Sequence, residues 1–141
     1  MPCMKRSTQP EAMASAWFSE QGHQVFLMQW AHLQRVTRPE LRLLFAIPNG
    51  GLRHPAVAAA LKASGVKAGV PDLFLPVARG IWHGLWIELK APAYPLYKKA
   101  AGKTSDEQER WLEDLYAEGY CCHVCHGWEH AQRVILDYLD A

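Results

Sequence analysis

Apolar side chains in the first third of the chain recur at roughly helical spacing, at Trp17, Val25, Met28 and Leu33. This pattern predicts a helix from about residue 10 to about residue 36, which the dipeptide Arg38-Pro39 ends. Gly22 falls inside the helix, so a break or a late start at that position stays open.

Beyond Pro39 the pattern changes to short apolar runs separated by glycine and proline. The run Leu43–Ile47 predicts a buried strand, which Pro48 and the following Asn-Gly-Gly end in a turn. Similar runs predict strands over 72–77, 85–90 and 120–126. Helical patterns cover 55–64, 105–118 and 128–139, and glycines follow the first two as C-cap signals. This order predicts a mixed α/β fold with a central sheet and at least one parallel strand pair.

Length and composition are consistent with one packed domain. The chain has 141 residues, of which 50% are hydrophobic and 21% are charged, so wholesale disorder is not expected. We expect a single domain over residues 1–141, with residues 1–10 as a flexible tail. The net charge of +1 is a weak hint at nucleic-acid binding, so any DNA-binding face has to come from local clustering of basic residues.

The sequence offers no signal for a membrane or secreted protein. It contains no run of 18 apolar residues, and residues 1–10 have no apolar h-region. The four cysteines are Cys3, Cys121, Cys122 and Cys125, and three of them crowd together in poor spacing for a disulfide framework. We therefore expect reduced thiols and a cytoplasmic location.

A small set of charged residues stands out for its chemistry. Asp72 is placed where a strand is predicted to begin, and Glu88 and Lys90 lie two apart in the next strand. Their side chains then share one face with Trp86, while Leu85, Ile87 and Leu89 point the other way. A Glu and a Lys on an otherwise apolar strand are costly unless they are paired or functional.

Two carboxylates can hold one hard divalent cation, Mg²⁺ or Mn²⁺, through their oxygens, and the backbone carbonyl of Leu89 is a further candidate ligand. Such an ion polarises a phosphate and lowers the pKa of its bound water, and a lysine beside that water stabilises developing negative charge. The alternative is that Asp72 is a turn residue and that Glu88 and Lys90 lie on a solvated face. From the residues alone, both interpretations stay open.

These residues resemble the signature of the PD-(D/E)xK nuclease superfamily, and the wider pattern is similar to its VRR-NUC family. The resemblance extends over about residues 19 to 139. It depends on Ile47-Pro48-Asn49-Gly50-Gly51, Gly69-Val70-Pro71-Asp72-Leu73, Trp86-Ile87-Glu88-Leu89-Lys90, Ser105-Asp106-Glu107-Gln108 and Gly119-Tyr120. It implies a restriction-endonuclease-like fold with a mixed central sheet of about four strands flanked by helices. The Val-Arg-Arg tripeptide of the family's name does not occur in this chain.

By position, the resemblance implies that Asp72 and Glu88 bind the metal and that Lys90 is the catalytic lysine. Glu20 matches the N-terminal acid that completes the metal site, and Gln24, one helical turn further on, faces the same way. Gln108 matches a glutamine beside the active site. Each of these two additions has an alternative, because Glu20 also suits a solvated helix surface and Gln108 also suits a capping box with Ser105.

Several residues outside this centre are candidates for DNA contacts. Two basic sets flank the catalytic segment and suit phosphates, and two tyrosines suit stacking on unpaired bases; an ordinary solvated loop explains them equally well. Asn49 is a candidate for contact with the substrate backbone, with a simple turn as its alternative. The basic candidates are Arg53, Lys62, Lys67, Lys98, Lys99 and Lys103, and the aromatic ones are Tyr94 and Tyr97.

The resulting expectation is a Mg²⁺- or Mn²⁺-dependent DNA nuclease, selective for junctions or flaps, that works as a homodimer. The resemblance adds a setting in phage or prophage DNA replication, recombination or repair. One alternative is a catalytically inactive DNA-binding module of the same fold. Another is a zinc-stabilised interaction domain built on Cys121, His123 and Cys125, although their spacing is not that of paired Cys-x-x-Cys motifs.

Overall fold

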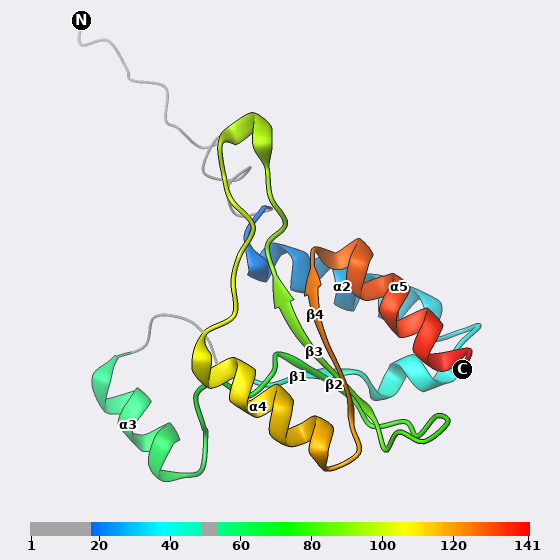
Figure 1. Cartoon of the computed structure of the whole chain (residues 1–141), viewed down its shortest axis with the longest axis horizontal. Helices are drawn as coiled ribbons and strands as arrows, with labels where there is room; N and C mark the ends of the chain where they lie inside the picture. The colour runs from blue at the N-terminus through cyan, green and yellow to red at the C-terminus, as the bar shows by residue number, and fades with distance from the viewer. Residues whose placement is uncertain (1–17, 49–53) are drawn as a thin grey trace, which may run out of the picture.

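The computed structural model describes residues 18–48 and 54–141. In chain order the described helices and strands are α2 (Glu20–Gln34), the 3₁₀-helix η1 (Pro39–Leu43), β1 (Phe45–Ala46), α3 (Pro55–Ala63), β2 (Leu73–Leu75), β3 (Leu85–Lys90), the 3₁₀-helix η2 (Pro95–Tyr97), α4 (Asp106–Ala117), β4 (Cys121–His126) and α5 (Trp128–Leu139) (Figure 1).

The four strands form one mixed sheet in the order β1-β2-β3-β4. The pairs β1–β2 and β2–β3 are antiparallel, whereas β3 and β4 run parallel. The predicted mixed sheet and its parallel pair are therefore confirmed. Because α4 separates β3 from β4 in the chain, it provides the crossover that a parallel pair needs.

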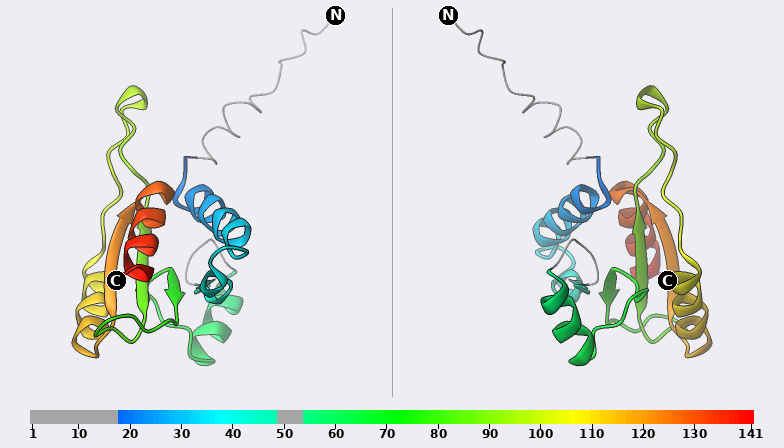
Figure 2. Two further views of the ribbon diagram at one scale, coloured as in Figure 1. Left: turned by 90° about the vertical axis from the view of Figure 1, so that its right-hand side faces the viewer. Right: turned by 90° about the vertical axis from the view of Figure 1, so that its left-hand side faces the viewer.

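Helices cover both faces of the sheet (Figure 2). On one face, α2 and α5 pack against each other and against β3, and Leu85, Ile87 and Leu89 point into this core with at most 1% of their surface exposed. On the other face, α4 packs against β4. Alternation along β3 turns Trp86, Glu88 and Lys90 toward that second face. The sheet thus separates the main apolar core from a face that holds ionisable groups.

Capping residues set the start of the two helices next to these groups. The Ser19 side chain accepts a hydrogen bond from Gly22 N at the start of α2. Gly22 lies in the first turn and does not interrupt the helix, which begins two residues before it. At α4, Ser105 and Gln108 form a complete capping box.

Three predicted boundaries are wrong. The strand expected over residues 72–77 is limited to Leu73–Leu75. The strand expected over residues 43–47 shrinks to Phe45–Ala46, and it is exposed rather than buried because it is the edge strand of the sheet. Helix α2 ends at Gln34, before Arg38-Pro39, and Pro39 instead opens η1, where its fixed φ suits the first helical position. Leu41 in η1 and Leu44, its C-cap residue, are buried in the core, so this part of the chain contributes to the core without forming a buried strand.

Residues 91–104, here called the arm, connect β3 to α4 and project beyond the end of the sheet (Figure 1). No helix in the described part of the chain is long and apolar enough to cross a membrane.

Candidate active site

The antiparallel register of β2 and β3 brings Asp72 to Glu88. Leu73 pairs with Ile87, and the same register, continued by one residue, sets Asp72 opposite Glu88. Asp72 Oδ2 accepts a hydrogen bond of 2.7 Å from the backbone N–H of Leu89. The Asp72 carbonyl accepts another from Ile47 N at 2.8 Å. Both the side chain and the backbone of Asp72 are therefore fixed against neighbouring strands.

The loop before Asp72 is held tightly against α4. Gly69 has a φ of +85°, and a Cβ on it would lie 2.8 Å from Glu107 Cγ and 3.0 Å from Trp111 Cδ1. Trp111 Nε1 donates a hydrogen bond of 3.1 Å to the Ala68 carbonyl. Only glycine fits this close approach at positive φ, so the Gly-Val-Pro-Asp motif delivers Asp72 to the sheet by packing its loop on α4.

Glu88 is a buried carboxyl group that contacts Gln108 and interacts with the Asp72 carboxyl group. Its Oε1 accepts a hydrogen bond of 2.8 Å from Gln108 Nε2 and lies 3.3 Å from Lys90 Nζ. Its Oε2 is buried and has no hydrogen-bond partner among the described residues. An unsatisfied buried oxygen is rare and calls for an explanation such as a bound ion.

Both carboxyl groups hold their protons more tightly than usual. Burial, and then the negative charge of Asp72, raises the pKa of Glu88 to about 8, against the opposing effect of Lys90. Burial also raises the pKa of Asp72, although its hydrogen bonds with the Leu89 N–H and with the Glu88 side chain act in the opposite direction. Two desolvated acids side by side cannot both ionise easily without a cation.

Lys90 lies between acids from two elements. Its ammonium group donates a hydrogen bond of 3.1 Å to Gln108 Oε1. The same group lies 3.7 Å from Glu20 Oε1 at the start of α2. Lys90 is only 6% exposed, so these partners compensate for much of its desolvation. The structure thus brings both Glu20 and Gln108 to Lys90, while their roles at a metal site stay predictions. Gln108 Oε1 also accepts 2.9 Å from Ser105 N, so this residue caps α4 and contacts the site at once.

The donor set fits a hard divalent cation. No three His, Cys, Asp or Glu side chains among the described residues gather into a metal-binding group, so side chains alone would not complete such a site. Asp72 and Glu88 are two oxygen donors, and one Glu88 oxygen is free. The N–H and C=O of a strand residue face the same side, so the Leu89 carbonyl is directed toward Asp72. Mg²⁺ and Mn²⁺ accept such a set, with water in the remaining positions.

The other predicted residues lie away from this cluster or beyond the described residues. Lys62, Lys67, Lys98, Lys99 and Lys103 are all exposed, the last three on the arm. Gln24 lines a surface groove along α2. Asn49 and Arg53 lie outside the described residues.

The cysteine strand is part of the fold. Cys125 is fully buried in the core, where burial raises the pKa of its thiol, and burial likewise raises the pKa of Cys121. Raised thiol pKa values disfavour the thiolate form that zinc requires.

Sequence reasoning missed two residues, His23 and Gly102, that hold the arm against the rest of the protein. His23 is buried, accepts 3.0 Å from Trp128 N through Nδ1, and contacts the hydroxyl of Tyr94 through Nε2. A Cβ on Gly102 would lie 3.3 Å from Lys90 Cβ, so the arm returns directly over the lysine. The only sequence signal for this close approach to Lys90 was that Gly102 is a glycine within a lysine-rich loop.

Together, the mixed sheet and its carboxylate-lysine cluster define the class as a nuclease-like α/β domain. The profile of the VRR-NUC domain family matches residues 5–129. A solved structure of a "VRR_NUC domain protein" is 32% identical in sequence, covers 86% of this chain and 88% of its own, and superposes with a TM-score of 0.70. A comparison with curated proteins gave no significant match. The chain belongs to the VRR-NUC family, and the restriction-endonuclease-like mixed fold implied by its motifs is confirmed.

Proposed function

We propose that this protein is a divalent-metal-dependent nuclease that hydrolyses DNA phosphodiester bonds at Asp72, Glu88 and Lys90. One observation supports this above the others: Glu88 keeps a buried oxygen without a partner, beside a second acid and a lysine. A catalytically inactive binding module of the same fold has no chemical need for this arrangement, which is costly to the folded state.

In the proposed site, Asp72, Glu88 and the Leu89 carbonyl would hold Mg²⁺ or Mn²⁺, and Glu20 would add a third acidic side chain. The ion, when bound, acts as a Lewis acid on the scissile phosphate and lowers the pKa of a nearby water. Glu88, with its pKa of about 8, gives up its proton when it becomes a ligand. The apolar packing of β3 fixes Glu88, and the hydrogen bond from Leu89 N fixes Asp72, before any substrate arrives.

Lys90 orients the attacking water and stabilises the negative charge that grows on the phosphate. Gln108 positions both groups, because its amide oxygen accepts from Lys90 while its amide nitrogen donates to Glu88. It acts as a positioning residue in this proposal. The salt bridge to Glu20 at 3.7 Å holds the ammonium group in position beside Glu88.

We further propose that Lys67, Lys98, Lys99 and Lys103 contact DNA phosphates, with Asn49 and Arg53 beside the substrate backbone. Exposed lysines at the two ends of the catalytic segment support this assignment. The preferred substrate is a branched DNA, a junction or flap, of the kind formed in phage or prophage replication, recombination or repair. The setting is carried by the family resemblance alone.

A homodimer completes the proposal. One site cuts one strand, so symmetric cleavage of a junction needs two copies related by a two-fold axis. Sedimentation equilibrium at micromolar concentration tests this: a mass near twice 15.9 kDa is expected, and a single-chain mass in the presence of junction DNA overturns it.

The decisive experiment compares cleavage of labelled duplex, flap and four-way-junction DNA in Mg²⁺, Mn²⁺ or EDTA. Asp72→Asn, Glu88→Gln and Lys90→Met each remove one group with little change in volume, and each is expected to reduce cleavage by at least about a hundredfold. Glu113→Gln and Arg133→Met are matched controls on exposed helix surfaces and should cut like the wild type.

Binding without cutting in any metal would identify the protein as an inactive DNA-binding module. Cleavage that survives Asp72→Asn and Lys90→Met would show that the site is misplaced or that a contaminant is responsible.

A further inference from the structure

The arm is a stiff projection with an exposed apolar tip. Tyr94 and Lys99 exchange two backbone hydrogen bonds of 2.9 and 3.1 Å, which close a narrow neck below the tip. Pro95–Tyr97 form the single turn η2, and Lys98 follows it in the left-handed conformation with φ 52°. Closed at its neck and tightly turned, the tip presents its side chains in one arrangement.

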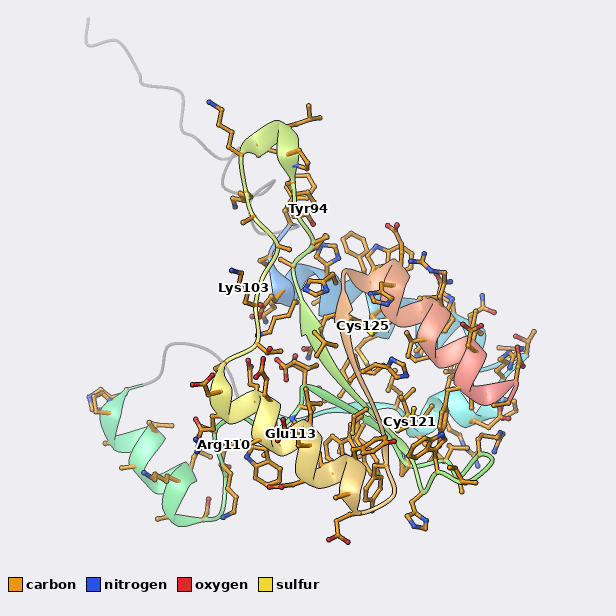
Figure 3. The ribbon with its side chains drawn as sticks, viewed as in Figure 1. Tyr94, Lys103, Arg110, Glu113, Cys121 and Cys125 are labelled. Atoms are coloured by element: carbon orange, nitrogen blue, oxygen red, sulfur yellow. The ribbon has the colours of Figure 1, made fainter. Side chains whose placement is uncertain are left out.

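The neck is anchored to the body of the protein from two sides. Tyr94 contacts His23 of α2 through its hydroxyl, and its ring lies 4.8 Å from that of Phe18 (Figure 3). On the returning limb, Gly102 N donates 3.0 Å to the Ala91 carbonyl, and the Gly102 carbonyl contacts His126 Nε2 at 3.0 Å. Tyr94 is thereby occupied. Tyr97 lies with its ring 5.6 Å from the same Phe18 ring but stays 64% exposed, so of the two tyrosines proposed for base stacking Tyr97 keeps the accessible face.

The composition of the arm specifies the chemistry of its partner. Leu96 is 94% exposed and Tyr97 64% exposed, which is unusual for apolar side chains at the tip of an ordered loop. Three exposed lysines, Lys98, Lys99 and Lys103, follow them, and residues 91–104 contain no acidic residue. A chain with a net charge of only +1 therefore concentrates positive charge on this projection, as a polyanion requires.

An apolar tip followed by lysines suits DNA at a point where base pairs are exposed. Apolar side chains inserted at a base step replace stacking, and this costs least where pairing already ends. Aromatic rings also stack on bases without regard to sequence. The arm rises from Lys90 and returns over it at Gly102, so DNA engaged at the tip lies in a fixed relation to the proposed catalytic centre.

We propose that the arm recognises the branch point of DNA: Leu96 and Tyr97 pack against the last base pair of a duplex that opens into single strands, and the lysines hold the flanking phosphates. The proposal rests on the proposed DNA substrate and names the feature of that substrate that the protein selects. It extends the function because none of these contacts takes part in the hydrolysis.

The test uses a duplex that ends in two unpaired oligo-thymidine arms, with 2-aminopurine at the last paired position. Binding is measured by anisotropy in Ca²⁺, with the DNA checked to be intact, and the aminopurine fluorescence reports unstacking of the terminal pair. Leu96→Ser is expected to weaken binding of the fork about tenfold, the scale of one stacking contact, and to abolish the fluorescence change. The loss for a fully paired duplex should be smaller.

Ile81→Ser is the matched control. Ile81 is 81% exposed at the tip of the short turn between Arg79 and Trp82. The substitution therefore removes a similarly exposed apolar side chain from elsewhere on the surface. It should bind the fork like the wild type. Equal behaviour of the two variants, or no binding of the fork by the wild type, would overturn the proposal. So would a fall in the solution mass of DNA-free Leu96→Ser with unchanged fork binding, because the tip would then be a protein contact.

The outcomes separate this proposal from the proposed function. If Leu96→Ser loses the fork but no DNA is ever cut in Mg²⁺ or Mn²⁺, the arm assignment stands and the nuclease assignment falls. If Asp72-dependent cleavage is present but Leu96→Ser binds the fork normally, the nuclease stands and the arm assignment falls.

Discussion

Gln108 is bonded to Glu88 through its amide nitrogen at 2.8 Å while the oxygen of the same amide caps the start of its own helix. The capping bond fixes which end of the amide is the acceptor, so the nitrogen is directed at Glu88 without freedom to flip. The sequence left open whether Gln108 caps α4 or serves the site, and the geometry combines the two. An ordinary capping box thereby orients a buried acid.

Gln108→Glu separates these two roles. Glutamate is as good as glutamine in a capping box, and a negative charge suits the first turn of a helix, so the thermal midpoint should change little near pH 6. The lost donor and the added charge beside Glu88 should lower cleavage by about 10- to 100-fold, as for other residues that orient metal ligands.

Gln108→Ala is the counterpart variant, since it loses the cap as well and should cost about 1 kcal/mol of stability. Unfolding curves and initial cleavage rates of both variants give the comparison. Equal activity of Gln108→Glu and the wild type would reduce Gln108 to a capping residue.

Binding of Mg²⁺ or Mn²⁺ should release protons at neutral pH. With a pKa of about 8, Glu88 is largely protonated at pH 7 in the metal-free protein, and a carboxyl group has to ionise to become a ligand. Titration calorimetry in two buffers of different ionisation enthalpy should show release of close to one proton per metal ion at pH 7, and less above pH 8. A buffer-independent binding enthalpy at pH 7 contradicts the assignment of Glu88 as a ligand.

Without metal, Glu88 should make the folded state less stable as pH rises. Its pKa is raised from 4.5 to about 8 on folding, so the native state binds the proton more tightly than the unfolded chain. The stabilisation is complete below pH 4.5 and is lost as pH rises toward 8. Thermal midpoints in EDTA should therefore fall across this window by several degrees more for the wild type than for Glu88→Gln, whose side chain does not titrate. Parallel curves for the two proteins would show that burial does not perturb Glu88.

The catalytic strand was predictable from sequence, whereas its surroundings were only partly so. The run Leu85–Lys90 places Leu85, Ile87 and Leu89 on one face, and its predicted bounds agree with β3 because the core on that face determines the register. The contact between Lys90 and Gln108 joins residues of separate elements, and only the family resemblance suggested it. No local pattern reveals that His23 reaches Tyr94 across 71 positions.

The apolar run at residues 43–47 is a case in which the local pattern gave a wrong prediction. Its hydrophobicity predicted a buried strand, but hydrophobic content does not show where a strand lies in the sheet. Phe45 is at the edge, 45% exposed, with its ring 5.8 Å from that of Phe74. Edge position is a property of the whole topology, so it could not be derived from the five residues themselves.

His23 should make stability and arm anchoring sensitive to acid. Burial lowers the pKa of His23 from 6.5, partly opposed by Glu129, and Nδ1 accepts from Trp128 N at 3.0 Å. Protonation at Nδ1 would break that bond. The contribution of His23 is therefore present above pH 6.5 and is lost as pH falls through its lowered pKa.

Urea unfolding above and below pH 6.5 compares the wild type with His23→Asn and His23→Ala. Asn keeps an acceptor for Trp128 N but does not titrate, so its stability should change less with pH, while Ala should lose stability at both pH values. An acid-induced loss of the same size in His23→Asn and the wild type would assign the effect to other groups.

Gly69 and Gly65 form a matched pair that measures how tightly the loop before Asp72 is held. Both have positive φ, +85° and +105°, but a Cβ at Gly69 would meet Glu107 and Trp111 at 2.8 and 3.0 Å, whereas a Cβ at Gly65 would meet nothing within 4 Å. Alanine at Gly65 adds only backbone strain, about 1 kcal/mol. Alanine at Gly69 adds the same strain and a steric conflict with α4, typically another 1–3 kcal/mol.

Because this packing also sets the position of Asp72, Gly69→Ala should lower cleavage and metal affinity as well, and Gly65→Ala should leave both unchanged. Denaturant unfolding and metal titration of the two variants measure the two effects separately. Equal loss of stability in both would mean that the loop yields to the extra methyl group, and the Asp72 carboxylate would then have to be held by its bond to Leu89 alone.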